Sequence, residues 1–198
     1  MSISITYRPT LVDRLVKRSL VADLLLVLSG TAITALAAQL YIPNEPVPFT
    51  FQTLAVLLVG SALGSTRGAA SMFLYAVLGG AGLPLFSEHS SGWNVLFGAT
   101  GGYIIGFIIA AALVGWLAEK GWSQTGLGML GSYAIGSLVI YALGSAWLTY
   151  AVLGGEWLGA QGGLAYGVIP FLAFDAIKAF VAAAILPEAW RLVGKLKG

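Results

Sequence analysis

The segment Pro170-Phe171-Leu172-Ala173-Phe174-Asp175-Ala176-Ile177-Lys178 begins the last long apolar run of the chain and places two opposite charges inside it. Residues three positions apart lie on the same face of a helix, so Asp175 and Lys178 are placed side by side. Each charge at the centre of a membrane-spanning helix costs about 2.5–3.5 kcal/mol by insertion scales. Two interpretations explain how that cost is offset. Either the pair neutralises itself inside a packed bundle, or it is held ready for a polar ligand, and the residues alone leave both open.

The composition indicates an integral membrane protein. Of 198 residues, 58% are hydrophobic and 9% are charged, whereas a soluble domain carries about 25% charged residues. A spanning helix needs about 20 apolar residues, so the chain has room for about five to seven of them. It leaves no room for a separate ATPase domain, and it has no Gly-x-x-x-x-Gly-Lys-Ser/Thr loop.

The residues that carry most enzyme and metal chemistry are scarce. The chain has no Cys and one His, His89, which excludes disulfides, thiolate metal sites and a Cys nucleophile. No second carboxylate is expected near Asp175 for acid–base work. We therefore expect no enzyme activity, no catalytic residue, no metal site, no cofactor and no nucleic-acid partner.

Six apolar runs are predicted to span the membrane. Pro43, Pro46 and Pro48 keep the segment after the first run extended, because proline removes a donor and restricts its predecessor. We expect a tight turn over residues 64–68 and a polar loop over 84–98. The predicted spans are residues 20–40, 52–63, 69–83, 100–118, 126–150 and a last one that starts between 164 and 170 and ends near 186.

Basic residues orient this bundle. Six spans put both termini on one side, and nine of the ten Lys and Arg residues fall on that side, which the positive-inside rule makes cytoplasmic. The opposite loops carry Glu45, Glu88 and Glu156 and no Lys or Arg. The exception is Lys178, about 12 Å below a helix start near Pro170, in the outer half of the membrane.

The predicted fold class is therefore an all-α integral membrane protein, a compact bundle of six transmembrane helices with both termini cytoplasmic. Its organisation is a cytoplasmic N-terminal segment (1–19), the six-helix domain (20–186) and a cytoplasmic C-terminal tail (187–198). Small residues recur on the first helix, and internal packing explains such a stripe better than docking of a partner does. The stripe consists of Gly30, Thr31, Thr34, Ala35 and Ala38.

Polar side chains converge on the outer half of this bundle. Thr50 and Gln52 end the first outer loop, Asn94 belongs to the second, and Asp175 and Lys178 lie under the third. Asp offers only acceptors, Lys only donors, and Asn and Gln both. Such a pocket suits a small ligand with an apolar body, an amide-like end and an acidic end. Candidate aromatic walls are Phe49, Trp93, Tyr103 and Phe174.

Four motifs in register resemble one family. They are Val47-Pro48-Phe49-Thr50-Phe51-Gln52-Thr53, Leu78-Gly79-Gly80-Ala81-Gly82-Leu83-Pro84-Leu85-Phe86, Gly98-Ala99-Thr100-Gly101-Gly102-Tyr103, and Pro170-Phe171 followed by Asp175 and Lys178. Together they are similar to BioY, the substrate-binding (S) component of the biotin transporter in the energy-coupling factor (ECF) class. The resemblance extends from residue 24 to residue 186.

The resemblance implies a binding site and partners. Asp175 and Asn94 would hydrogen-bond the ureido ring of biotin, and Lys178 would pair with its valerate carboxylate. Further pocket residues would be Thr50, Gln52 and Tyr103, with Trp93 and Phe49 as walls. The implied setting is the cytoplasmic membrane of a prokaryote, with the site facing outward, amid membrane lipid and with a transmembrane coupling protein and two cytoplasmic ATPases.

Two alternative functions stay open, and the sequence departs from the family pattern in two places. The alternatives are an S component for another vitamin and a self-sufficient secondary transporter coupled to protons through Asp175; a homo-oligomer is also left open. The family motif carries Pro where this chain has Ala99, which loosens a loop without removing a ligand contact. The small residues of the first helix are mixed, whereas the family tends to repeat Ala, and this weakens the inference of docking to the coupling protein.

Overall fold

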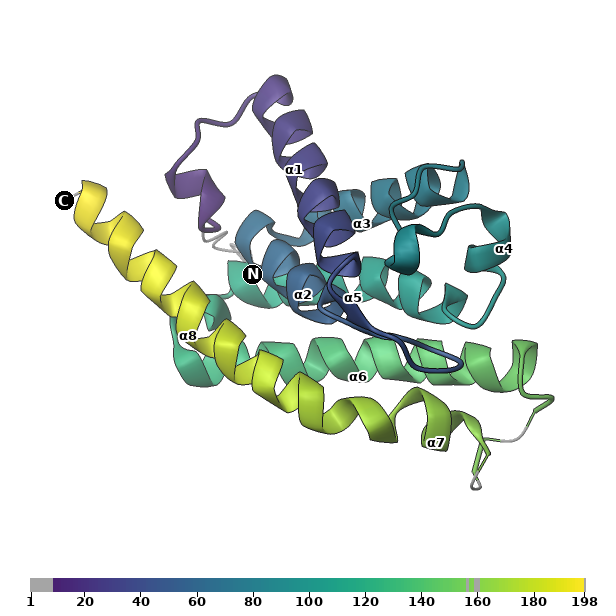
Figure 1. Ribbon diagram of the computed structural model, residues 1–198. Coiled ribbons are helices and arrows are strands. Elements are labelled where there is room, and N and C mark those ends of the chain that lie inside the picture. Colours follow the sequence, from purple (N-terminus) through teal and green to yellow (C-terminus); the bar gives the residue numbers. More distant parts are fainter. Residues whose placement is uncertain (1–8, 156, 159–160, 198) are drawn as a thin grey trace, which may run out of the picture.

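The computed structural model describes residues 9–155, 157–158 and 161–197, so Arg8 and Glu156, which entered the orientation argument, lie outside the described residues. Within those ranges the chain forms eight α-helices, four 3-10 turns and one two-stranded hairpin (Figure 1). The helices are α1 (Leu20–Ala38), α2 (Gln52–Leu63), α3 (Ser65–Gly80), α4 (Trp93–Leu96), α5 (Gly101–Glu119), α6 (Gly126–Ala151), α7 (Gly163–Gly167) and α8 (Leu172–Lys197).

The shorter elements lie between these helices. Strand β1 (Tyr41–Ile42) pairs antiparallel with β2 (Phe49–Thr50), with Tyr41 opposite Thr50. The 3-10 turns are η1 (Val12–Arg14), η2 (Ser87–His89), η3 (Trp122–Gln124) and η4 (Ile169–Phe171).

The fold is helical and of membrane type. Among the described residues, α1, α5, α6 and the stretch Gly163–Lys195 are long and apolar enough to cross a bilayer. At 1.5 Å per residue, the 12 residues of α2 extend only about 18 Å. The 16-residue α3 carries Arg67 in its first turn. Four of the six predicted spans thus meet the length and composition expected of a spanning helix.

Helix α5 lies at the centre of the bundle, against α2, α3 and α6. Glycines let α5 and α6 approach closely. A Cβ atom on Gly102 would lie 2.2 Å from Cβ of Trp147 and 2.6 Å from the carbonyl oxygen of Leu143. One on Gly144 would lie 2.3 Å from the ring of Tyr103. Small residues serve this purpose in membrane bundles, where apolar burial does not by itself drive helices together.

The small-residue stripe of α1 packs inside the molecule. Gly30, Thr31, Thr34 and Ala38 are buried, and the Thr31 hydroxyl donates to the carbonyl oxygen of Ser71 on α3 at 2.9 Å. The opposite face of α1 is apolar and exposed, with Leu20, Leu24, Leu28 and Leu36 all more than half accessible. The preference for internal packing is therefore confirmed for these four residues.

The predicted turn over residues 64–68 is wrong except at its first residue. Gly64 alone turns the chain, with φ of 89°, and α3 begins at Ser65. A distant residue permits this, because Oε1 of Glu119 at the end of α5 accepts from the Ser65 N–H at 2.8 Å. An acidic group at a helix N-terminus satisfies a backbone donor and interacts favourably with the helix dipole.

The predicted end of the last helix near residue 186 is also wrong, since α8 continues through Pro187 to Lys197. Proline removes one backbone hydrogen bond, but packing after it keeps the helix intact. Trp190 and Val193 are buried, Nε1 of Trp190 donates to the Ser123 hydroxyl at 3.1 Å, and the Arg14 guanidinium lies 5.5 Å from the Trp190 ring centroid. Figure 1 shows α8 running along α6 and projecting beyond it at its C-terminal end.

A charge network joins η1, α1 and α3 at this end of the bundle. Arg67 donates to Asp23 at 2.8 Å and to Asp13 at 2.9 Å, and Asp13 also accepts from Arg18 and Thr10. Burial alone would raise the pKa of Asp13, but these hydrogen bonds outweigh it and hold the pKa well below its ordinary range. Asp13 therefore anchors the segment before α1 to the start of α3.

We expect Gly102→Ala to destabilise the protein, since overfilling a tight contact costs about 1–3 kcal/mol. The thermal unfolding midpoint in detergent should fall. Gly194→Ala is the matched control, because no atom lies within 4 Å of the Cβ it would add, and an exposed helical Gly→Ala change stabilises by roughly 0.5–1 kcal/mol. Equal midpoints for the two variants would contradict the close α5–α6 contact.

Acid should weaken the network around Asp13. A carboxylate whose folded pKa is depressed stabilises the folded state above its unfolded pKa of about 3.9, and this contribution is lost as pH falls through the folded value. We therefore expect Asp13→Asn to lower the unfolding midpoint at pH 7 and to shrink the difference between pH 6 and pH 3. Glu88→Gln, at an exposed position, should leave both quantities unchanged.

Candidate functional site

A cavity of about 50 Å³ lies among α2, α5, α6, α8 and the segment that leads into α2. Small-molecule sites have volumes of roughly 300–1,000 Å³, so this cavity is contracted around its polar groups. Its lining residues are Val47, Pro48, Thr50, Gln52, Thr53, Phe86, Ser87, Thr100, Tyr103, Ile104, Phe107, Tyr141, Phe171, Asp175 and Lys178.

Lys178 is fully engaged in this cavity. Its Nζ donates to Oδ1 of Asp175 at 2.5 Å, to the carbonyl oxygen of Thr50 at 2.7 Å and to the hydroxyl of Thr53 at 2.8 Å. The Lys178 and Asp175 side chains are 3% and 6% exposed. An ammonium has three donors, so the buried cation has a partner for each of them.

Asp175 is held from its other side as well. Tyr141 on α6 donates its hydroxyl to Oδ2 at 2.6 Å, and the Thr53 hydroxyl donates to Oδ1 at 3.1 Å. Thr53 thus bridges the pair, accepting from Lys178 while donating to Asp175. Residues from α2, α6 and α8 meet at this carboxylate, and its negative charge has a donor at both oxygens.

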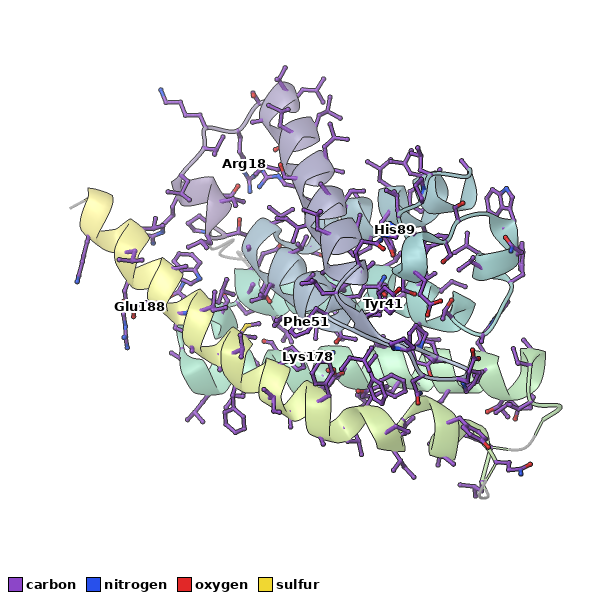
Figure 2. The ribbon with its side chains drawn as sticks, viewed as in Figure 1. Arg18, Tyr41, Phe51, His89, Lys178 and Glu188 are labelled. Atoms are coloured by element: carbon purple, nitrogen blue, oxygen red, sulfur yellow. The ribbon has the colours of Figure 1, made fainter. Side chains whose placement is uncertain are left out.

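Aromatic rings cover the cation. Nζ of Lys178 lies 4.4 Å from the ring centroid of Phe174 and 5.9 Å from that of Phe51, within the range in which a ring face attracts a cation. Figure 2 shows Lys178 and Phe51 close together in the middle of the molecule. Phe49 packs on Phe171 with a centroid distance of 4.7 Å. The site is therefore a charged pair with an aromatic wall.

The proline-rich segment brings Thr50 and Gln52 to this wall. The β1–β2 pairing returns the chain to the end of α1, and the Phe51 N–H donates to the Leu40 carbonyl oxygen at 3.1 Å. The Thr50 hydroxyl donates to Oε1 of Gln52 at 3.0 Å, and Nε2 of Gln52 contacts the Tyr75 hydroxyl at 2.6 Å. Gln52 thereby connects the cavity to α3.

The ring of Tyr103 lines the cavity, while its hydroxyl forms a hydrogen bond with the backbone. That hydroxyl donates to the carbonyl oxygen of Gly167 at 2.7 Å, which ties α5 to the end of α7. A Cβ atom on Gly167 would lie 2.4 Å from the same hydroxyl. The ring of Tyr103 is thus fixed as an apolar surface beside the charged pair.

The structure brings five of the eight predicted site residues to one cavity and a sixth, Phe49, to its aromatic wall. It places the remaining two, Trp93 and Asn94, on the exposed helix α4, outside the cavity lining. Trp93 is 58% exposed, and Oδ1 of Asn94 lies close to its own loop at Gly92. Their roles in binding stay predictions.

Sequence reasoning missed Tyr141 and the bridging role of Thr53. Thr53 stands inside the first quoted motif, next to Gln52. Tyr141 had a signal that was available: membrane tyrosines gather at the two interfaces, and this one lies in the middle of a spanning run. No group of three or more His, Asp or Glu side chains that could hold a metal occurs in the described part of the chain.

Comparison with known proteins gives a consistent result. A family model described as BioY family matches residues 9–195. The chain is 39% identical over 155 residues to the biotin transporter BioY of Thermotoga maritima, covering 78% of this chain and 88% of that protein. It is 36% identical over 154 residues to the probable biotin transporter BioY of Pyrococcus horikoshii, covering 78% and 87%.

Two further matches support the same family and fold. The biotin transporter BioY2 of Lactococcus lactis is 35% identical over 162 residues, covering 80% of this chain and 85% of that protein. A crystal structure of the S-component for biotin from an ECF-type ABC transporter matches with a TM-score of 0.74 at 24% identity, covering 86% of this chain and 92% of that one. The structural match shows a shared fold.

We expect Lys178→Met to destabilise the ligand-free protein by about 3–5 kcal/mol, because it leaves the Asp175 carboxylate buried without its cation. Asp175→Asn combined with Lys178→Met should recover part of that loss, since two neutral side chains of similar volume remove the unpaired charge. Thermal unfolding in detergent measures both. A single variant as stable as the unmodified chain would show that the pair is not buried together.

Proposed function

Because this chain belongs to the BioY family, we propose that it binds biotin and acts in biotin uptake as the S component of an ECF transporter. The observation that carries the proposal is the buried Lys178–Asp175 pair, set in a cavity with an aromatic wall and offering one cation and one anion. Biotin has a carboxylate, an apolar ring and chain, and a ureido group that both donates and accepts. The proposed role is transport without catalysis.

Biotin binding requires either that Lys178 and Asp175 separate or that both contact the same end of the ligand. In biotin the ureido ring and the carboxylate lie at opposite ends of the molecule, whereas Nζ of Lys178 and Oδ1 of Asp175 are 2.5 Å apart. We propose that Lys178 turns towards the carboxylate while Asp175 accepts from the ureido N–H groups. The alternative keeps the pair together, with Lys178 donating to the ureido oxygen beside those N–H groups.

The cavity has to widen for either arrangement. The rings of Phe49 and Phe171 and the proline-rich segment form the wall that can move without breaking a helix, because they lie on β2, η4 and a loop. Thr50, Gln52 and Tyr103 are proposed to line the widened pocket. Trp93 and Asn94 take part if α4 moves over the bound ligand, in which case Asn94 hydrogen-bonds the ureido ring.

The proposed topology has six passes with both termini cytoplasmic. In this topology helices α1, α2, α3, α5, α6 and α8 are proposed to alternate in direction. Arg67 joins the start of α3 to α1 and η1, Glu119 joins it to the end of α5, and Trp190 joins the second half of α8 to η3, which supports placing these parts at one end of the bundle. Basic residues of the described chain gather at that end, and by the positive-inside rule it faces the cytoplasm. The cavity then lies towards the outside.

The proposed partners follow from the S-component role. They are membrane lipid around the exposed apolar face of α1, a transmembrane coupling protein and two cytoplasmic ATPases. A rival is a self-sufficient proton-coupled transporter that uses Asp175. The structure favours the S component, because the Asp175 carboxylate is already paired with a cation and held by two hydroxyl groups. An S component for another vitamin is the second rival, and binding assays separate the two.

We expect the purified chain in detergent to bind biotin without any partner. Asp175→Asn and Lys178→Met should each weaken binding at least about 30-fold, since removing one member of a buried charge pair at an interface costs about 2–5 kcal/mol. Glu88→Gln should bind as the unmodified chain does. A chain that ignores biotin but binds another vitamin would disprove the substrate and keep the class.

A comparison of biotin with its neutral amide distinguishes the two proposed arrangements of Lys178 and Asp175. If Lys178 pairs with the carboxylate, the unmodified chain prefers biotin to its amide, and Lys178→Met removes that preference. If Lys178 instead donates to the ureido oxygen, Lys178→Met weakens both ligands equally and leaves the preference unchanged. The ratio of the two dissociation constants is the measured quantity, so a general loss of folded protein does not affect the result.

A further inference from the structure

Tyr141 and Asp175 form a wall between the charged site and a groove on the side of the bundle. Both residues line the cavity, and both also line an apolar groove of about 310 Å³ between α6 and α8. These helices belong to stretches long and apolar enough to span a membrane, and Leu138 and Leu172 in the groove are both more than half exposed. The groove therefore faces lipid, which has no water to donate a hydrogen bond. A donor for this side of the Asp175 carboxylate has to come from the protein.

Tyr141 supplies that donor. Its hydroxyl lies 2.6 Å from Oδ2 of Asp175, a length typical of the strong hydrogen bonds that hydroxyls donate to carboxylates. Lys178 and Thr53 both donate to the other oxygen, Oδ1. Tyr141 is itself held in place, because it is buried and its ring centroid lies 6.5 Å from that of Phe171. The two oxygens of the carboxylate thus have different partners: α6 binds Oδ2, while α2 and α8 bind Oδ1.

This arrangement keeps Lys178 on one oxygen of Asp175. Either oxygen of a carboxylate can accept from an ammonium, and a buried oxygen without a donor carries its full desolvation penalty. Without the Tyr141 hydroxyl, the Asp175 side chain would turn so that Lys178 shares both oxygens, which tightens the ligand-free ion pair and leaves the carboxylate without a single orientation. With the hydroxyl present, Oδ1 has one position.

We propose that Tyr141 is a positioning residue of the biotin site: its hydroxyl holds Asp175 so that Oδ1 is ready to accept from a ureido N–H group. The inference rests on the proposed biotin binding. It holds for both arrangements of Lys178, because Asp175 accepts from the ureido ring in each of them. A side chain that is already ordered loses little conformational entropy when the ligand binds. The Tyr141 hydroxyl therefore favours ligands with an N–H donor at this end, and it acts on them through Asp175.

Tyr141→Phe tests this, since it removes the hydroxyl and keeps the ring in the wall. The dissociation constant for biotin should rise about two- to tenfold, the range that ordering one side chain on binding provides. The hydrogen bond exists with and without ligand, so only the difference between these two states changes the affinity. Tyr150→Phe is the matched control: it makes the same change on the same helix at a residue that is 72% exposed, and biotin affinity should not change.

Two biotin analogues, each methylated at one of the two ureido nitrogens, separate positioning from a general structural role. Each analogue lacks one of the N–H donors that Asp175 is proposed to bind. If Tyr141 positions Asp175, the factor by which Tyr141→Phe weakens binding is smaller for at least one analogue than for biotin. A merely structural role would weaken all three ligands by the same factor. The measured quantity is a ratio of dissociation constants, so partial loss of folded protein does not affect it.

The route through Asp175 is tested by a double-mutant cycle. In an Asp175→Asn background, Tyr141→Phe should change the dissociation constant for biotin by less than about twofold, because the carboxylate that the hydroxyl orients is gone. An unchanged affinity in Tyr141→Phe alone, an equal factor for biotin and both analogues, or an equal factor in both backgrounds would each overturn the inference. If the unmodified chain binds no biotin, the proposed function fails first; biotin binding with no effect of Tyr141→Phe refutes the inference alone.

Discussion

The structure depends on burying one ion pair where a lone charge would not be tolerated. An isolated Lys or Asp at the centre of a membrane helix costs about 2.5–3.5 kcal/mol, and the mutual attraction of a buried pair repays desolvation only when every remaining donor and acceptor is matched. Here α2 supplies Thr53, α6 supplies Tyr141, and the extended segment supplies the carbonyl oxygen of Thr50. Because these contacts come from parts of the chain far apart in sequence, the pair fixes how those parts meet.

The two ends of the bundle differ in how they are held. At one end, Arg67 joins two carboxylates and Glu119 caps α3, so three helices and η1 are fixed by charge. At the other end, Phe49, Phe171 and the short elements β2 and η4 form the aromatic wall beside the cavity, and Lys178 ties β2 to α8 through the carbonyl oxygen of Thr50. Local opening is easiest where backbone is irregular and contacts are few. The site therefore lies at the end of the molecule that can adapt.

Sequence reasoning predicted the elements that local chemistry determines. The start of α2 at Gln52 follows from prolines that prevent a helix before it, and the proximity of Asp175 and Lys178 follows from helical spacing. It failed where a distant residue decides the outcome. Glu119 allows α3 to begin directly after Gly64, and packing of Trp190 on Ser123 carries α8 past Pro187. Thr53 and Tyr141 were missed as partners of the pair for the same reason, since only the packing of three helices brings them together.

A complete network without ligand has a consequence for transport. If the empty site held unpaired charges, the release of biotin would leave those charges buried without partners. Release would then cost their full desolvation free energy. Here the three donors of Lys178 have protein acceptors when no ligand is present, so binding and release exchange one set of hydrogen bonds for another. The free-energy difference between the two sets can then be small although each contact is strong. An S component has to bind a scarce vitamin and later release it, and a self-satisfied pair allows both.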